Sequence, residues 1–101
     1  MNYDQRPYDK WQAYGQAKSG QSLMAVELDR REKGNGIRSF AVHPGGIFTA
    51  LQRHLGTAEM AKFGWTDADG SPSAVAEKLF KSPSQGCATS LWAATALSLD
   101  G

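Results

Sequence analysis

One short apolar segment restricts the folds open to this chain. Residues 37–43 (Ile-Arg-Ser-Phe-Ala-Val-His) have a nearly continuous apolar second half and lie between Gly34-Asn35-Gly36 and Pro44-Gly45-Gly46. A short apolar run bounded by glycine and proline is typical of a strand buried in a parallel sheet. A single parallel strand leaves its own backbone groups unpaired, so we expect it to need neighbouring strands that this chain does not supply.

A long helix is predicted before that strand, over residues 9–33. Asp9 and Gln12 form a variant of the capping box, because a carboxylate and an amide at this spacing can satisfy free backbone groups. Gly34-Asn35-Gly36 ends the helix with residues that adopt left-handed backbone angles. A helix, a glycine turn and a buried strand form half of a βαβ unit, whose preceding strand is missing here.

The later elements are predicted from local signals. The loop 44–49 follows the strand, where open α/β sheets bind their ligands. Residues 48–55 indicate a short amphipathic helix, and the variable segment 57–82 indicates short helical stretches at 57–63 and 74–80 around a loop at 66–72. Ser82, Pro83 and Gln85 form the clearest helix cap of the chain. The last helix is therefore predicted over residues 83–97.

The composition of the 101 residues removes several classes of function. Eleven basic and ten acidic residues leave a formal charge of +1, and no basic block marks a nucleic-acid surface. No apolar run is long enough to predict a membrane span, and the polar first residues lack the core of a signal peptide. Cys87 is the only cysteine, and the acidic residues show no metal-ligand spacing. We expect one small, metal-free domain in the cytoplasm.

Tyr14 and Lys18 are the candidate catalytic residues. Four residues apart on a helix, they share one face and lie about 6 Å apart along the axis. Free tyrosine has a pKa of about 10, so proton transfer near pH 7 requires about 4 kcal/mol of help. A nearby positive charge supplies about 1 kcal/mol in water and about 4 kcal/mol at an effective dielectric near 20. The pair can therefore work only in a partly desolvated cleft.

Three pieces in order resemble the short-chain dehydrogenase/reductase family, in its carboxyl-terminal segment and its retinol-dehydrogenase-like branch. They are the helix with Tyr14 and Lys18, the strand 37–43 and the turn His43-Pro44-Gly45-Gly46-Ile47-Phe48-Thr49. The resemblance implies an α/β fold, the carboxyl-terminal part of a Rossmann-type doubly wound parallel sheet. Residues 1–101 would then be a helix-dominated fragment of one NAD(P)-binding domain.

The same resemblance implies the role of each site residue. Tyr14 would be the general acid/base for an alcohol or carbonyl substrate, and Lys18 would make its phenol more acidic and bind the nicotinamide ribose. Pro44 and Gly45 would shape the nicotinamide wall, the backbone of Ile47 would meet the carboxamide, and Thr49 would contact the carboxamide or a phosphate. The cofactor would be NAD or NADP.

Departures from the family pattern change the functional expectation. The glycine-rich turn that binds pyrophosphate has no counterpart, and no serine precedes Tyr14. We therefore expect an oxidoreductase fragment that is inactive by itself. Two alternatives stay open. One is a non-catalytic interaction fragment that forms a homo-oligomer or binds a full-length relative through the Tyr14 helix and the last helix, and the other is a truncated gene product without independent function.

Several other residues have a structural interpretation. His43 ends the expected strand and is interpreted as structural rather than as a base, and His54 as solvated. Cys87 lies among small residues and is interpreted as packing. Thr49 has two open interpretations, a cofactor contact and a helix cap. Trp65 lies in the weakly patterned segment and is the best tryptophan for a substrate contact.

Overall fold

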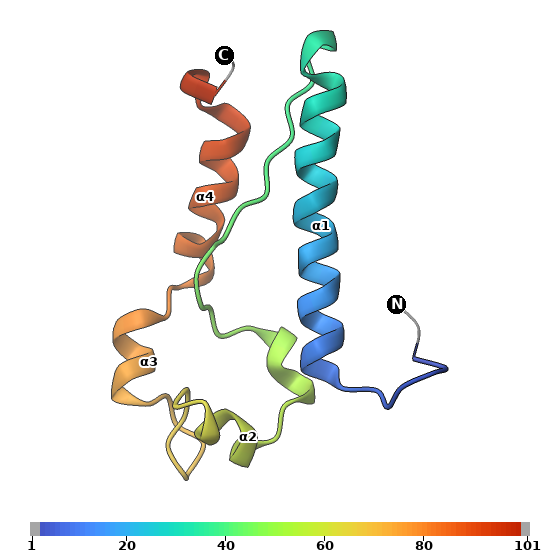
Figure 1. The fold of residues 1–101 in the computed structure, drawn as a ribbon. Helices are drawn as coiled ribbons and strands as arrows, with labels where there is room; N and C mark the ends of the chain where they lie inside the picture. Colours follow the sequence, from blue (N-terminus) through green and yellow to red (C-terminus); the bar gives the residue numbers. More distant parts are fainter. Residues whose placement is uncertain (1–2, 100–101) are drawn as a thin grey trace. The chain divides into compact units, whose positions relative to one another are not determined.

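The computed structural model describes residues 3–99, and this part of the chain is helical (Figure 1). It divides into two compact units, one made of residues up to 42 with those from 97 onward, the other of residues 43–96. The elements are α1 (Lys10–Glu32), η1 (Lys33–Asn35), η2 (Ala50–His54), α2 (Thr57–Lys62), α3 (Ala74–Leu79), α4 (Pro83–Thr95) and η3 (Leu97–Leu99).

The first unit is built on α1. The helix predicted over residues 9–33 matches it to within one residue at each end. The carboxylate of Asp9 caps the helix by accepting a hydrogen bond from the backbone N–H of Gln12 at 2.7 Å. At the other end, η1 closes on Gly36, whose φ of 78° is left-handed. A side chain would strain the backbone there, which explains why glycine occupies this turn.

The strand predicted over residues 37–43 is wrong for the part of the chain that is described. The segment has no regular secondary structure, and residues 3–99 contain two isolated bridges but no strand. A parallel strand takes its hydrogen bonds from neighbouring strands, and none pairs with this segment. Its apolar side chains Ile37, Phe40 and Val42 are therefore exposed. The observed fold class is helix-rich, and the Rossmann-type sheet stays a prediction.

Asp29 of α1 holds the start of this irregular segment. Its carboxylate forms an ion pair with the Arg38 guanidinium at 2.7 Å and accepts the Ser39 backbone N–H at 3.1 Å. These contacts lower the pKa of Asp29, with the Arg38 hydrogen bond as the largest cause. Arg38 also donates to the backbone carbonyl of Leu99. One carboxylate thus positions the chain as it leaves the helix.

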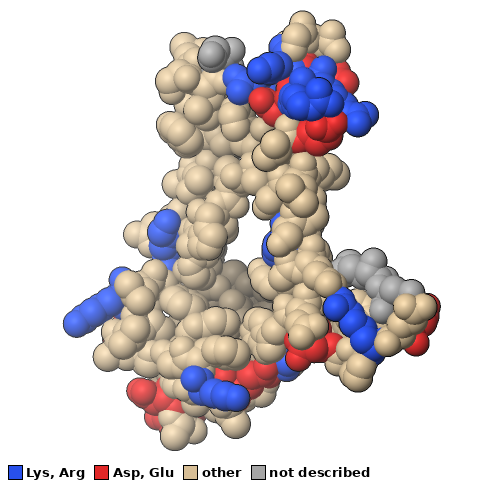
Figure 2. Space-filling view, in the orientation of Figure 1, with Lys and Arg blue, Asp and Glu red and all other residues tan. Residues whose placement is uncertain are grey.

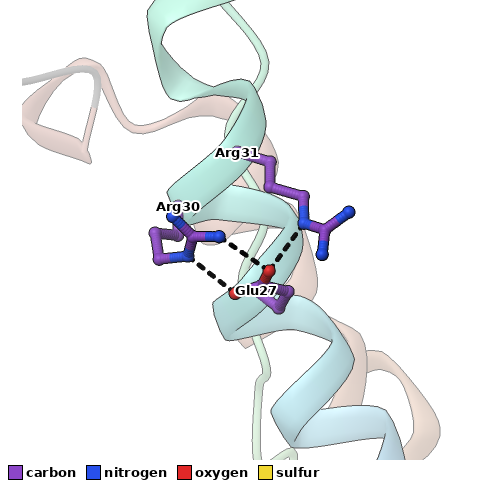
Figure 3. A network of polar contacts seen from close by, with 3 residues as sticks. All are labelled: Glu27, Arg30 and Arg31. Atoms are coloured by element: carbon purple, nitrogen blue, oxygen red, sulfur yellow. Dashed lines mark hydrogen bonds and ion pairs between the residues drawn. The ribbon is translucent and has the colours of Figure 1, made fainter.

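A second ionic cluster stiffens the last third of α1. The two oxygens of Glu27 accept hydrogen bonds from Arg30 at 2.7 and 2.8 Å and from Arg31 at 2.6 Å (Figure 3). The two arginines lower the pKa of Glu27 to about 2, mainly through these hydrogen bonds. Charged side chains of both signs gather around this end of α1 (Figure 2). The pairs are three and four residues apart, the spacing at which helix side chains meet.

The second unit contains the short helices, and the cap of its last helix follows the sequence prediction. Ser82 and Gln85 form a reciprocal capping box at the start of α4, and Pro83 is the first helical residue. Helices α2 and α3 lie within the predicted helical stretches. The last helix is shorter than the predicted 83–97, because α4 ends at Thr95 and the chain continues into η3.

Burial is sparse among the described residues. Ala25 and Ala76 are the buried apolar residues of this part of the chain, and it contains no large side chain that is fully buried. Leu23, Val26 and Leu97 are 70%, 67% and 85% exposed. Within residues 3–99 no helix is long and apolar enough to cross a membrane. The apolar faces of the helices are therefore largely uncovered in this chain.

Candidate active site

Tyr14 and Lys18 lie on one face of α1, as their spacing predicts. The Lys18 ammonium nitrogen is 5.6 Å from the centre of the Tyr14 ring. Trp11, one turn earlier, meets Tyr14 edge-on with 6.4 Å between the ring centres. The helix thus holds a cation, a phenol and an indole in a row. The lysine contacts the ring face, which is a cation–π arrangement.

Tyr14 is accessible, with 51% of its surface exposed. Its hydroxyl can therefore reach a molecule from outside the chain. The same exposure means that the partly desolvated cleft, which the pair needs for proton transfer near neutral pH, is not formed around Tyr14 by the described residues. The geometry places the phenol and the ammonium on one helix face but leaves both exposed to water.

The loop 44–49 lies in the second unit and is held by the segment before α4. The backbone N–H of Lys81 donates to the carbonyl of Gly46 at 2.8 Å, and Ile47 forms a parallel bridge with Lys81. Gly45 has a left-handed φ of 91°, which glycine adopts without strain. The Pro44-Gly45-Gly46 turn is thus a defined backbone feature.

Two glycines allow close packing around this loop. A Cβ atom on Gly46 would lie 2.8 Å from the Phe80 ring, and one on Gly86 of α4 would lie 2.2 Å from Cδ1 of Ile47. Both distances are too short for real atoms, so the absence of a side chain is what permits the contact. The side chain of Ile47 is therefore seated against the first turn of α4.

Thr49 caps η2, which supports one of its two sequence interpretations without testing the other. Its hydroxyl accepts the backbone N–H of Leu51 at 3.2 Å. The side-chain oxygen of Gln52 accepts the backbone N–H of Thr49 at 2.8 Å and faces its hydroxyl at 3.3 Å. The side-chain nitrogen of Gln52 donates to the carbonyl of Ile47 at 2.8 Å. One side chain therefore holds both ends of the Ile47–Thr49 segment.

Sequence reasoning missed Gln52 and the aromatic residue Phe80. The spacing Thr49-x-x-Gln52 is a capping-box signal that could have identified Gln52. No comparable local signal exists for Phe80, which packs on Phe48 with ring centres 4.4 Å apart and on Trp65 at 5.9 Å. Trp65 is thus part of an aromatic cluster beside the loop.

Other interpretations are corrected by the structure. Cys87 is exposed rather than packed, and its thiol faces the Ser84 carbonyl at 3.0 Å. His43 is exposed and does not end a buried strand. Its Nδ1 accepts the Gly45 backbone N–H at 3.0 Å, which agrees with the structural interpretation of this residue. Metal-binding clusters of His, Cys, Asp or Glu are absent from the described residues.

The predicted site residues fall into two groups. Tyr14 and Lys18 belong to the first unit, whereas Pro44, Gly45, Ile47 and Thr49 belong to the second. Each group is well defined within its own unit. The first group is a phenol and an ammonium on one helix face, and the second is a turn whose backbone is held by hydrogen bonds.

Comparisons with known proteins find relatives along nearly the whole chain. A probable oxidoreductase of Streptomyces lividans is 39% identical over 100 residues, covering 99% of this chain and 33% of the relative. A short-chain dehydrogenase/reductase of Penicillium roqueforti is 35% identical over 94 residues, covering 93% and 26%. Human retinol dehydrogenase 13 is 41% identical over 56 residues, covering 55% and 17%.

The chain spans about a third of the length of the probable oxidoreductases that it matches. No family model and no solved structure matches it.

Proposed function

Because the chain is homologous to a segment of short-chain dehydrogenases/reductases, we propose that it carries the proton-transfer pair and part of the nicotinamide site of an NAD(P)-dependent oxidoreductase. The substrate would be an alcohol or a carbonyl compound. The observation that carries this proposal is the Tyr14–Lys18 pair on one face of α1, with 5.6 Å between the ammonium nitrogen and the ring centre. The probable oxidoreductase and the short-chain dehydrogenase/reductase align with the region that contains it.

Tyr14 would exchange a proton with the substrate oxygen, and its exposure leaves the hydroxyl free to do so. Lys18 would stabilise the phenolate form through its positive charge and hydrogen-bond the ribose of the cofactor. Both roles require exclusion of water around the pair, since charge–charge interactions are weak in bulk water. A bound nicotinamide would supply the acceptor or donor of the hydride.

The second unit offers a loop that fits a neutral carboxamide. Gly45 and Gly46 carry no side chains of their own, and the N–H of Ile47 has no hydrogen-bond partner within residues 3–99. A free backbone donor beside a glycine turn suits a carbonyl acceptor, because it orients the ligand without adding charge. Pro44 and Thr49 would line the same wall.

Turnover by the 101-residue chain alone should be low, because Tyr14 is half exposed and the pair is not desolvated. The role of Tyr14 is therefore best measured in a chimera. In it, this chain replaces the matched 100-residue segment of the Streptomyces lividans relative. Alcohol-dependent reduction of NAD⁺ or NADP⁺ should fall about 10²- to 10⁴-fold in Tyr14→Phe, the usual contribution of general acid–base catalysis.

The matched control is Tyr8→Phe, which removes an exposed phenol just before α1. It should leave turnover unchanged. Equal rates for Tyr14→Phe and Tyr8→Phe in an active chimera would rule out Tyr14 as the acid/base.

A non-catalytic interaction fragment is the second candidate. It is favoured by exposed apolar side chains on α1 and α4, namely Leu23, Met24, Val26, Leu91 and Trp92. Helices that expose such residues associate with other surfaces. Sedimentation over a range of concentrations tests it, because a homo-oligomer would dissociate on dilution.

A further inference from the structure

The orientation of the Ile47 peptide groups is fixed from two sides. The carbonyl of Gly46 accepts the N–H of Lys81, and this bond belongs to the parallel bridge between Ile47 and Lys81. In a parallel pair, the peptide groups flanking the bridged residue point to the partner, so its own N–H and carbonyl point away from it. Ile47 therefore presents both polar groups on the side opposite Lys81.

Gln52 binds only one of those two groups, the Ile47 carbonyl. Its side-chain amide donates to the Ile47 carbonyl at 2.8 Å, while its side-chain oxygen accepts the N–H of Thr49 at 2.8 Å. The Ile47 carbonyl is thus occupied. The Ile47 N–H is left as a donor without a partner in the described part of the chain.

We propose that Gln52 is a positioning residue for the nicotinamide carboxamide. By occupying the carbonyl of Ile47 and tying Thr49 to the same side chain, Gln52 makes this segment a donor-only surface that accepts the carboxamide oxygen. This inference rests on the proposed function, because it assumes that the loop 44–49 meets a nicotinamide.

The chain contains a matched control for this role. Gln85 occupies the same third helical position of a capping box, and its side-chain oxygen accepts the N–H of Ser82 at 2.9 Å. Gln52 also donates to the Ile47 carbonyl, and no equivalent bond from the Gln85 side-chain nitrogen is found among the described residues. Substituting both glutamines in the same way therefore separates positioning from helix capping.

The test is a titration of the full 101-residue chain with NAD⁺ and NADP⁺, followed by the Ile47 amide resonance in NMR and by calorimetry. Gln52→Glu keeps the acceptor for Thr49 but cannot donate to the Ile47 carbonyl. It should weaken binding about three- to tenfold, the value of one neutral hydrogen bond. Gln85→Glu should bind as the unchanged chain does.

A second ligand shows whether the effect passes through the carboxamide. An NAD⁺ analogue with an amino group in place of the carboxamide lacks the oxygen acceptor, so Gln52→Glu should bind it as the unchanged chain does. Equal weakening for both ligands would overturn the positioning role, and so would equal affinities of the two glutamate variants for NAD⁺.

If Gln52→Glu does not fold, the pair Gln52→Leu and Gln85→Leu is used instead. Each of these variants loses one capping box, so the two remain matched. Only the first should then weaken NAD⁺ binding, and equal losses would again count against the inference. If the unchanged chain binds neither NAD⁺ nor NADP⁺, the proposed cofactor site fails together with this inference. If the unchanged chain binds the cofactor and Gln52→Glu binds it equally well, only this inference fails.

Discussion

At the scale of single residues, Thr66 is the clearest conflict between burial and bonding. It is only 6% exposed, and its hydroxyl has no hydrogen-bond partner in the described chain. Thr66→Val keeps the shape and removes the unpaired hydroxyl, so we expect it to raise the free energy of unfolding by about 1 kcal/mol. A chemical denaturation curve measures this change.

Ser73→Ala is the contrasting variant. The Ser73 hydroxyl donates to the carbonyl of Gly64 at 2.6 Å and accepts the N–H of Ala76 at 3.0 Å, so it is buried with partners. Its removal should destabilise the chain by about 1 kcal/mol. A loss of stability in both variants would mean that Thr66 has a bonding partner after all.

At the scale of elements, the ionic end of α1 should respond to acid. Arg30 and Arg31 lower the pKa of Glu27 to about 2 from a usual value of 4.5. A lowered pKa means that the ionised carboxylate stabilises the folded helix. This contribution is fully present above about pH 4.5 and is lost as the pH falls towards about 2. Asp29, whose pKa is also lowered, acts in the same direction.

Circular dichroism at 222 nm from pH 7 to pH 2 measures that loss. The helical signal should decline with acid in the unchanged chain, and the decline should be smaller in Glu27→Gln, which has no carboxylate to protonate. Glu77→Gln removes a carboxylate of α3 instead. It should leave the decline of the unchanged chain as it was, and a reduction equal to that of Glu27→Gln would argue against the arginine pairs as its cause.

Two helical glycines should respond to alanine with opposite signs. Gly86 of α4 has no room for a Cβ, which would lie 2.2 Å from Cδ1 of Ile47, whereas Gly20 of α1 has nothing within 4 Å. Gly86→Ala should lower stability by about 1 kcal/mol through overpacking, and Gly20→Ala should raise it by about 1 kcal/mol through helix propensity. Thermal melts compare the two. Stabilisation by Gly86→Ala would show that Ile47 moves aside without cost.

The elements also show which parts of this fold could be predicted from the sequence. The caps at Asp9 and Ser82 and the turn at Gly36 depend on residues within four positions of one another, so local chemistry identified them. The strand over 37–43 depends on partners elsewhere in a sheet, and its apolar pattern alone could not create them. The same distinction holds in the site. The Tyr14–Lys18 pairing follows from helix spacing, whereas the contact of Gly86 with Ile47 joins positions far apart in sequence.

At the scale of the whole molecule, many large apolar side chains are exposed in the described part of the chain. Large apolar side chains are exposed along α1 and α4, and the buried apolar residues of the described part are two alanines. Exposed apolar area costs about 25 cal/mol per Å² relative to burial, so covering it with another surface is favourable. A second copy of this chain and the remainder of a longer protein would both provide such a surface. Measuring the molar mass over a range of concentrations distinguishes the two.

Self-association through α1 gives the sharpest whole-molecule prediction. Leu23→Glu with Val26→Glu places two charges on exposed apolar positions of the helix and keeps good helix formers. The double variant should shift the chain to monomer in light scattering after gel filtration. Ser19→Glu with Gln21→Glu adds the same charge at exposed polar positions of α1 and should leave the association unchanged.

If both double variants dissociate alike, net charge rather than the apolar face controls assembly. If the unchanged chain is a monomer at every concentration, the interaction-fragment function loses its support and the oxidoreductase proposal is unaffected.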